Sequence, residues 1–311
     1  MSQKVEVREV GLRDGLQLVK AVLSTEQKLE WCRRTALAGM PEIEVTSFVP
    51  VKVVPQFVDA DAVAGAAVRM GGFTAAALVP NLKGAERAFA AGVPKVNYVL
   101  SASEAHNLAN VRRSTQDSLD DFDRIVARRN EVAKGKVAIA GGIATAFGCT
   151  ISGAVSEKRV VAIAEQLARS GADEIIVADT VGYGNPGQVE RLTRAVARAV
   201  GDVPVACHFH DTRGLGLANV VAALNAGVRR FDAALGGLGG CPFAPGATGN
   251  INTEDCVFLL ESLGFDTGVD IEALIALRQT VESWLPGERF AGAIARAGLP
   301  KTFKVPVETA A

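Results

Sequence analysis

Two histidines one residue apart form the clearest chemical signal in this sequence. His208 and His210 lie in V-A-C-H-F-H-D-T, a run that predicts a β-strand ending in a polar turn. Side chains at i and i+2 of a strand point to one side, so both imidazoles can face a common point. Imidazole is a preferred ligand of first-row divalent metals, and a strand end holds two ligands rigidly. The spacing indicates a metal site, although both histidines could simply hydrogen-bond at a strand terminus.

The elements around this pair alternate between strand-like and helix-like segments. Strands rich in Val, Ile, Ala or Phe are predicted at 5–10, 42–46, 73–79, 95–100, 137–143, 174–178, 204–209 and 230–235. Helices are predicted at about 24–37, 58–68, 83–90, 118–133, 156–170, 187–200, 215–225 and 253–263. Ser24 and Gln27 have the spacing of a capping box, and glycines at 39, 92, 171 and 227 follow four helices.

The repeated helix, glycine, strand step predicts parallel βα units. Eight units over residues 1–268 favour an α/β fold of the (β/α)8 TIM barrel type, and an open doubly wound sheet is the alternative. Residues 269–311 are expected to form a short C-terminal helical extension, a helix and tail packed on or beside the barrel.

A glycine-rich run after the sixth strand imitates a dinucleotide loop. Gly182, Gly184 and Gly187 satisfy G-x-G-x-x-G. The run follows the sixth strand instead of the first, and Pro186 lies inside it. We therefore expect a turn here and no nicotinamide or flavin site.

In a TIM barrel the catalytic groups stand at the carboxyl ends of the strands. Asp14 follows the first strand, the two histidines end the seventh, and Asn250 closes the loop after the eighth. A carboxylate, two imidazoles and an amide oxygen can therefore converge on one cation. Further polar or nucleophilic residues at strand ends are Arg13, Gln17, Glu44, Ser47, Asn81, Asp179 and Cys241.

Some of these residues have a structural alternative. Arg13 and Asp14 could form a surface ion pair, and Asp179 could close an Asx turn or cap a helix. Cys241 could be a small buried hydrophobe, but its glycine-rich loop at the rim of the barrel favours proton transfer.

The composition of the chain indicates which classes of binding partner the protein can have. The net charge of -1 and the absence of a basic block argue against nucleic acid and anionic membranes. No apolar stretch approaches the roughly 20 residues that span a bilayer, and the first residues do not resemble a signal peptide. The five cysteines include no C-x-x-C pair and fit a reducing compartment. A cytoplasmic protein with a small-molecule partner is expected.

Six motifs lie in register from about residue 5 to 268, namely G-L-R-D-G-L-Q (11–17), I-E-V-T-S-F-V (43–49), V-P-N-L-K-G (79–84), A-D-T-V-G (178–182), H-F-H-D-T (208–212) and G-L-G-G-C-P-F-A-P-G-A-T-G-N (237–250). Together they resemble the hydroxymethylglutaryl-CoA lyase family. The resemblance implies a (β/α)8 barrel that binds Mg²⁺ or Mn²⁺ and cleaves 3-hydroxy-3-methylglutaryl-CoA to acetyl-CoA and acetoacetate. A homo-oligomer, dimer or higher, is also expected.

The resemblance also implies roles. The four converging residues match the metal ligands, namely Asp14, His208, His210 and Asn250. Arg13 matches the arginine that stabilises the thioester enolate, and Cys241 matches the catalytic cysteine, which we assign to the final protonation. Glu44 and Asp179 match acidic residues that support the site, and Gln17, Ser47 and Asn81 are expected to contact substrate. His208, Asp14 or Asp179 would accept the hydroxyl proton.

Several departures from the family pattern surround the expected acyl pocket. Apolar residues replace polar ones, and a new cation is present. The departures are Leu18, Val19, Ala144, Arg213, Gly214 and Leu215. They leave the metal and scission residues unchanged, so the expected reaction is the same and a related substrate such as citramalyl-CoA is an alternative.

Two other activities are alternatives. A Claisen-condensing synthase would share the barrel and its metal ligands, but such enzymes usually have a long C-terminal regulatory region, and few residues follow the eighth unit here. A noncatalytic acyl-CoA-binding barrel would be expected to have lost metal ligands, whereas all four are present.

Overall fold

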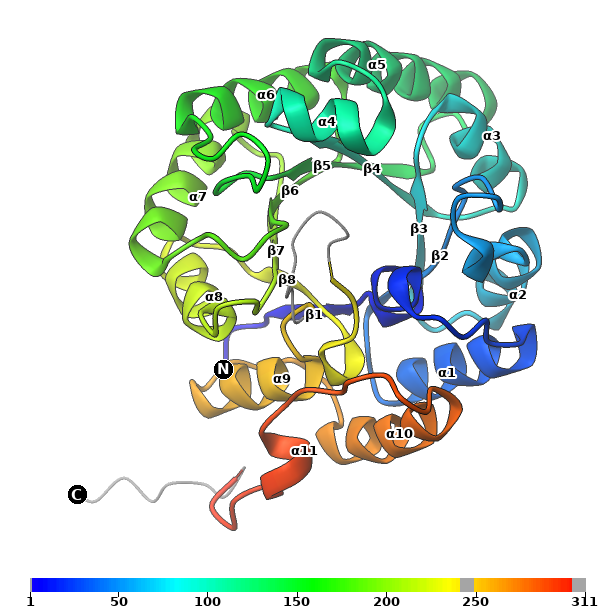
Figure 1. Cartoon of the computed structure of the whole chain (residues 1–311), viewed down its shortest axis with the longest axis vertical. Coiled ribbons are helices and arrows are strands. Elements are labelled where there is room, and N and C mark those ends of the chain that lie inside the picture. Colours follow the sequence, from blue (N-terminus) through cyan, green and yellow to red (C-terminus); the bar gives the residue numbers. More distant parts are fainter. Residues whose placement is uncertain (1, 241–248, 304–311) are drawn as a thin grey trace.

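The computed structural model describes residues 2–240 and 249–303, and within them parallel strands close into a barrel in the order β1 to β8 (Figure 1). Each strand pairs with the next, and β1 pairs with β8. The predicted (β/α)8 barrel is therefore confirmed. The strands are β1 (Glu6–Glu9), β2 (Glu42–Ser47), β3 (Thr74–Val79), β4 (Lys95–Ser101), β5 (Ala138–Ala144), β6 (Glu174–Asp179), β7 (Val205–Phe209) and β8 (Arg230–Ala233).

The helices surround the barrel, and the apolar core lies where they pack on the strands (Figure 1). The first six are α1 (Thr25–Leu37), α2 (Ala60–Met70), α3 (Leu82–Ala90), α4 (Glu104–Val111), α5 (Thr115–Val132) and α6 (Glu157–Ser170). The others are α7 (Pro186–Val200), α8 (Gly216–Asn225), α9 (Thr253–Ser262), α10 (Ile271–Trp284) and α11 (Ile294–Ala297). Among the described residues, no helix has the length and apolar character needed to cross a membrane.

Local sequence explains where several helices begin and end. The predicted capping box at the start of α1 is present, because Ser24 Oγ accepts from the Gln27 N–H and Gln27 Oε1 accepts from the Ser24 N–H. Gly171 follows α6 with φ +102°, a left-handed conformation that costs glycine little and lets the chain turn directly into β6.

Helix α4 and a turn after β1 are among the elements that the sequence patterns did not predict. Helix α4 is short, and its N-cap Ser103 accepts from the His106 N–H, while α5 begins at Thr115, three residues before the prediction. A π-helical turn at Gly11–Gly15 follows β1. Both unpredicted elements are too short for a clear apolar period, which is the signal used to predict helices.

The segment after β8 packs on the barrel near its first helix. Helix α10 contributes Leu274, Leu277 and Val281 to the main apolar core, and the Asp270 N–H donates to the Ala38 carbonyl at the end of α1. The expected domain boundary at residue 268 stays a prediction.

Candidate metal and catalytic site

Asp14, His208 and His210 meet at the carboxyl end of the barrel, and one possible ligand atom from each lies within 4.8 Å of the others. His210 Nε2 is 3.7 Å and His208 Nε2 is 4.0 Å from Asp14 Oδ2. Alternation along β7 points both imidazoles the same way, as the i, i+2 spacing predicts. The π-helical turn then aims Asp14 at them, because the N–H groups of Arg13, Asp14 and Gly15 all bond to the Val10 carbonyl.

Asn250 joins this group through the backbone and its side chain. It pairs with His210 in an isolated β-bridge, and its Nδ2 donates to Asp14 Oδ2 at 2.7 Å and to the Leu238 carbonyl at 2.9 Å. Its buried Oδ1 has no hydrogen-bond partner among the described residues. An unpaired buried carbonyl oxygen is costly unless a ligand satisfies it, so the donor set fits a divalent cation that prefers oxygen and imidazole ligands.

Gly239 keeps this site open. Its φ is +112°, and a Cβ there would lie 2.5 Å from Asn250 Nδ2 and 3.2 Å from Asp14 Oδ2. Any side chain at this position would push into the candidate ligands, which explains a glycine beside the site.

Arg13 lies next to the candidate ligands and is held by two carboxylates. Its Nε donates to Glu44 Oε2 and its Nη1 to Asp14 Oδ1, each at 2.5 Å. The other Glu44 oxygen accepts from Asn97 Nδ2 at 2.9 Å. Among the described residues, Nη2 of Arg13 has no hydrogen-bond or ion-pair partner, so this edge of the guanidinium can meet an anionic oxygen.

The electrostatics keep Asp14 ionised. Burial favours its neutral form, but Arg13 and the two imidazoles outweigh burial and hold the pKa of this carboxyl well below its usual range. A permanently charged carboxylate is the form that binds a metal ion.

Asp179 ends β6 near this group but is committed to a turn. Its two oxygens accept from the N–H groups of Tyr183 and Gly184 at 2.8 and 2.9 Å. Burial raises the pKa of the Asp179 carboxyl although these bonds and His210 oppose the rise. The glycine run at 182–187 forms this turn into α7, as the sequence predicts.

Three residues that were expected to contact the substrate lie at the end of a strand, in a turn or next to a helix, and two of them make local hydrogen bonds. Ser47 Oγ accepts from the Val49 N–H, and Asn81 is the N-cap of α3, where its side chain accepts from the Gly84 N–H. Gln17 is half-buried in the turn that follows Asp14. Their substrate contacts stay predictions, and Cys241 lies outside the described residues.

Sequence reasoning missed four buried polar residues that support the site, namely Arg8, Glu9, Asn97 and Asp232. All lie inside strands that the patterns treated as apolar. A polar residue within a fully buried strand needs a partner, and that conflict is the signal that could have identified them.

Glu9 links the two segments that flank the site. Its Oε1 accepts from the N–H groups of Gly11 and Leu235, and its Oε2 accepts from Thr253 Oγ1 at 2.7 Å. Burial raises the pKa of Glu9 from 4.5 to about 7, against these bonds. Between these pH values the folded protein holds a proton that the unfolded chain releases, so this stabilisation is present below pH 4.5 and is lost as the pH rises through 7.

Glu9→Gln should remove this pH dependence. The amide oxygen can keep both backbone hydrogen bonds, and its NH₂ group can donate to Thr253 Oγ1, which then acts as the acceptor. Because the amide is neutral at every pH, the stability of the variant relative to the native protein should rise between pH 5 and 8 by about 1–3 kcal/mol. Urea unfolding at both pH values measures this difference. Glu30→Gln, at an exposed carboxylate of α1, is the control and should leave the slope unchanged. Parallel curves for Glu9→Gln and the native protein would contradict the assignment.

Comparisons with known proteins identify the family to which the chain belongs. The HMGL-like family profile matches residues 4–281. The hydroxymethylglutaryl-CoA lyase of Bacillus subtilis (strain 168) is 40% identical over 280 residues, which cover 90% of this chain and 93% of the relative. The (R)-citramalyl-CoA lyase of Chloroflexus aurantiacus is 42% identical over 306 residues, 95% of each chain.

A solved structure extends the similarity to three dimensions. The HMG-CoA lyase from Acinetobacter baumannii, in complex with coenzyme A and 3-methylmalate, superposes with a TM-score of 0.90 at 42% identity and 98% coverage of both chains. With the family profile and the curated relatives, this match excludes the noncatalytic barrel. The chain belongs to the HMGL-like family and is a carbon–carbon lyase of the hydroxymethylglutaryl-CoA lyase type.

Proposed function

We propose that this protein is a metal-dependent acyl-CoA lyase. It cleaves 3-hydroxy-3-methylglutaryl-CoA, or a close analogue, to acetyl-CoA and a keto acid with Mg²⁺ or Mn²⁺ as cofactor. The observation that supports this best is the buried Asp14, His208 and His210 cluster, with the unpaired Asn250 oxygen, directly beside Arg13. Oxygen-rich sites with imidazole suit these two ions.

The reaction divides among the residues as follows. A divalent cation bound by the four ligands supplies a Lewis acid for the tertiary hydroxyl oxygen of the substrate. His208, Asp14 or Asp179 accepts the hydroxyl proton. Arg13 stabilises the negative charge that grows on the thioester oxygen as the carbon–carbon bond breaks, because Glu44 and Asp14 hold its guanidinium in place before the substrate arrives. Cys241 then protonates the enolate carbon.

Citramalyl-CoA is the second candidate substrate. The Chloroflexus aurantiacus relative named for that substrate is as similar as the hydroxymethylglutaryl-CoA lyases. The residues that depart from the family pattern also favour a changed acyl pocket. Arg213 packs over the Tyr183 ring at 4.5 Å and donates to the Val181 and Gly182 carbonyls in the loop after β6, so its charge is fixed one strand away from the histidines.

Metal removal combined with a substrate panel tests the proposed function. Chelation should reduce acetyl-CoA release to background, and added Mg²⁺ or Mn²⁺ should restore it, because the Lewis acid is worth several kcal/mol to the transition state. The comparison of 3-hydroxy-3-methylglutaryl-CoA with citramalyl-CoA as kcat/KM identifies the preferred acyl group. Full activity after chelation would disprove the metal dependence, and cleavage of neither thioester would disprove the proposed substrate class.

The proposal includes the cellular compartment and the oligomeric state of the protein. We also propose a cytoplasmic homo-oligomer, dimer or higher, and the cysteines, which include no C-x-x-C pair, fit a reducing compartment. Size-exclusion chromatography with light scattering measures the oligomer directly.

A further inference from the structure

A line of buried hydrogen bonds runs from the candidate metal ligand His208 down into the barrel. His208 Nδ1 is 3.2 Å from Asp232 Oδ2, and the other Asp232 oxygen accepts from Arg8 Nε at 2.7 Å. All three side chains are buried, at 8%, 7% and 2% exposure. In the described structure Asp232 is therefore shared between one imidazole and one guanidinium.

Strand register places these three residues in a row. Asp232 on β8 is paired with Arg8 on β1 and with His208 on β7. Paired residues of neighbouring parallel strands point to the same face, so the three side chains lie side by side within the barrel. Their arrangement follows from the barrel's closure between β8 and β1.

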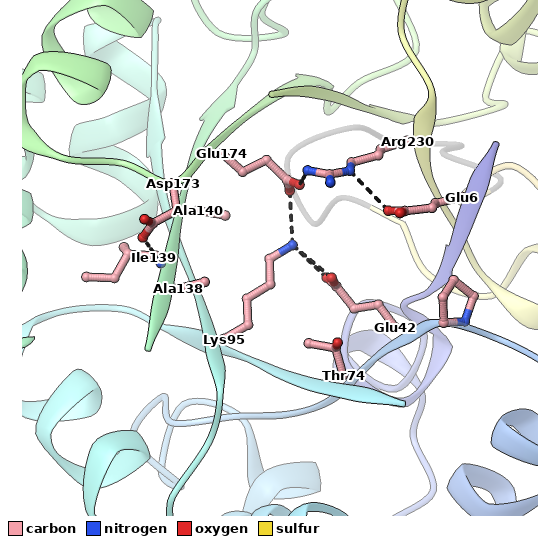
Figure 2. Close-up of a pocket in the computed structure, with 11 residues that line it drawn as sticks. Glu6, Glu42, Thr74, Lys95, Ala138, Ile139, Ala140, Asp173, Glu174 and Arg230 are labelled. Carbon is pink, nitrogen blue, oxygen red and sulfur yellow. Dashed lines mark hydrogen bonds and ion pairs between the residues drawn. The ribbon is translucent and has the colours of Figure 1, made fainter. Parts of the chain in front are cut away.

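A charged cluster at the opposite end of the barrel anchors Arg8. Its Nη1 donates to Glu174, which also accepts from Lys95 at 3.1 Å and from Arg230 at 2.9 Å. Figure 2 shows Glu174, Lys95 and Arg230 converging where the strands begin, and these residues line a cavity of about 270 Å³. Glu42, Lys95, Glu174 and Arg230 are the first residues of β2, β4, β6 and β8, and form one layer from alternate strands.

The polar atoms of this layer mostly satisfy one another. Lys95 also donates to Glu42 at 2.9 Å, and Arg230 Nε lies 3.0 Å from Glu6 Oε2. Because these groups are paired with one another, this end of the barrel is better suited to hold Arg8 in position than to bind a ligand.

We propose that Asp232 is a positioning residue for the metal site and that Arg8 holds Asp232 in place. The proposal rests on the proposed function. An ionised Asp232 accepts the proton of His208 Nδ1, which leaves the lone pair of Nε2 facing Asp14 and the cation. Carboxylates that orient metal-binding histidines in this way typically change metal affinity about 10–100-fold when they are replaced.

Arg8 and His208 both favour the charged carboxylate. Arg8 Nε lies 2.7 Å from one oxygen of Asp232 and His208 Nδ1 lies 3.2 Å from the other, and a buried cation at that distance stabilises the ionised form. Arg8 offers only donors, so it must meet acceptor oxygens of Asp232. The orientation of the carboxylate, and through it the tautomer of His208, is thus set by a cation that does not contact the metal ligands.

Asp232→Asn tests this inference with a nearly isosteric change. Arg8 forces the amide oxygen toward itself, so the NH₂ group turns to His208, where only an unprotonated Nδ1 can accept. His208 should then carry its proton on Nε2, the wrong tautomer for metal binding. We expect ¹⁵N-histidine NMR of the metal-free protein at alkaline pH to show Nδ1–H in the native protein and Nε2–H in the variant.

Metal affinity gives the second readout. The Kd for Mn²⁺, measured by titration calorimetry, should rise about 10–100-fold in Asp232→Asn. Asp121→Asn is the matched control, because Asp121 on α5 is also a buried aspartate paired with arginine, here Arg113 and Arg124, and it takes no part in the proposed site; its Kd should match the native value. If Asp232→Asn does not fold, Arg8→Met/Asp232→Leu removes the buried cation together with the acceptor for His208 Nδ1 and should still bind Mn²⁺ at least about 10-fold more weakly.

The possible failures are distinguishable. If the native protein binds no Mn²⁺, the proposed function is wrong at its metal site. If the native protein binds Mn²⁺ and Asp232→Asn binds it equally well with His208 in the same tautomer, the proposed function stands and the role of Asp232 is overturned.

Discussion

Replacing His210 by alanine is expected to lower kcat/KM for the cleaved thioester by about 10²–10⁴-fold. The change removes one of the two imidazoles from the candidate metal site. With the imidazole the transition state loses several kcal/mol of Lewis-acid stabilisation. The stoichiometry of bound Mn²⁺ should fall in parallel. Steady-state acetyl-CoA release and metal analysis of the purified variant measure the two effects.

The third histidine of the chain provides the control for this variant. His106 on α4 is also buried, and its Nδ1 is 2.7 Å from Ser101 Oγ at the end of β4. It does not belong to the group of Asp14, His208 and His210. His106→Ala should lower the melting temperature while leaving the metal stoichiometry intact. Retained metal and turnover in His210→Ala would contradict the assignment of this histidine as a ligand.

Arg13→Gln is expected to reduce kcat by about 10²–10³-fold with little change in metal binding. Removing one preorganised hydrogen-bond donor that stabilises the charge of the transition state typically has an effect of that size. The substitution also leaves Glu44, which is 2% exposed, without its cation. Breaking a buried ion pair costs about 3–5 kcal/mol, so a fall in stability should accompany the fall in turnover.

A double substitution separates these two effects. Arg13→Gln/Glu44→Gln removes the unpaired buried charge, and the new amide can still accept from Asn97. The double variant should regain most of the stability measured by urea unfolding and none of the turnover. Turnover that recovers together with stability would show that Arg13 acts only through the fold.

Several parts of the site could be read from local sequence. Strand alternation alone predicts that two histidines at i and i+2 face the same way. Asp14 after β1 and Asn250 after β8 are predicted to join them, because parallel strands present their carboxyl ends at one face of the barrel. Asn97 was not identified, because one asparagine in a buried strand does not indicate which neighbour it meets. Asp179 was identified as an acidic group of the site, yet its oxygens are used by the turn after β6.

The sequence by itself determined the βα repeat, the candidate metal ligands and the resemblance to a lyase family, since each depends on residue type and spacing along a few neighbouring positions. Only the tertiary structure decided that Glu44 holds Arg13, that Glu9 joins the segments beside the site, and that Asp232 lies between His208 and Arg8. Those contacts join residues up to 244 positions apart, and strand register after barrel closure brings them together. No local pattern encodes that register, because it results from the packing of all eight strands together.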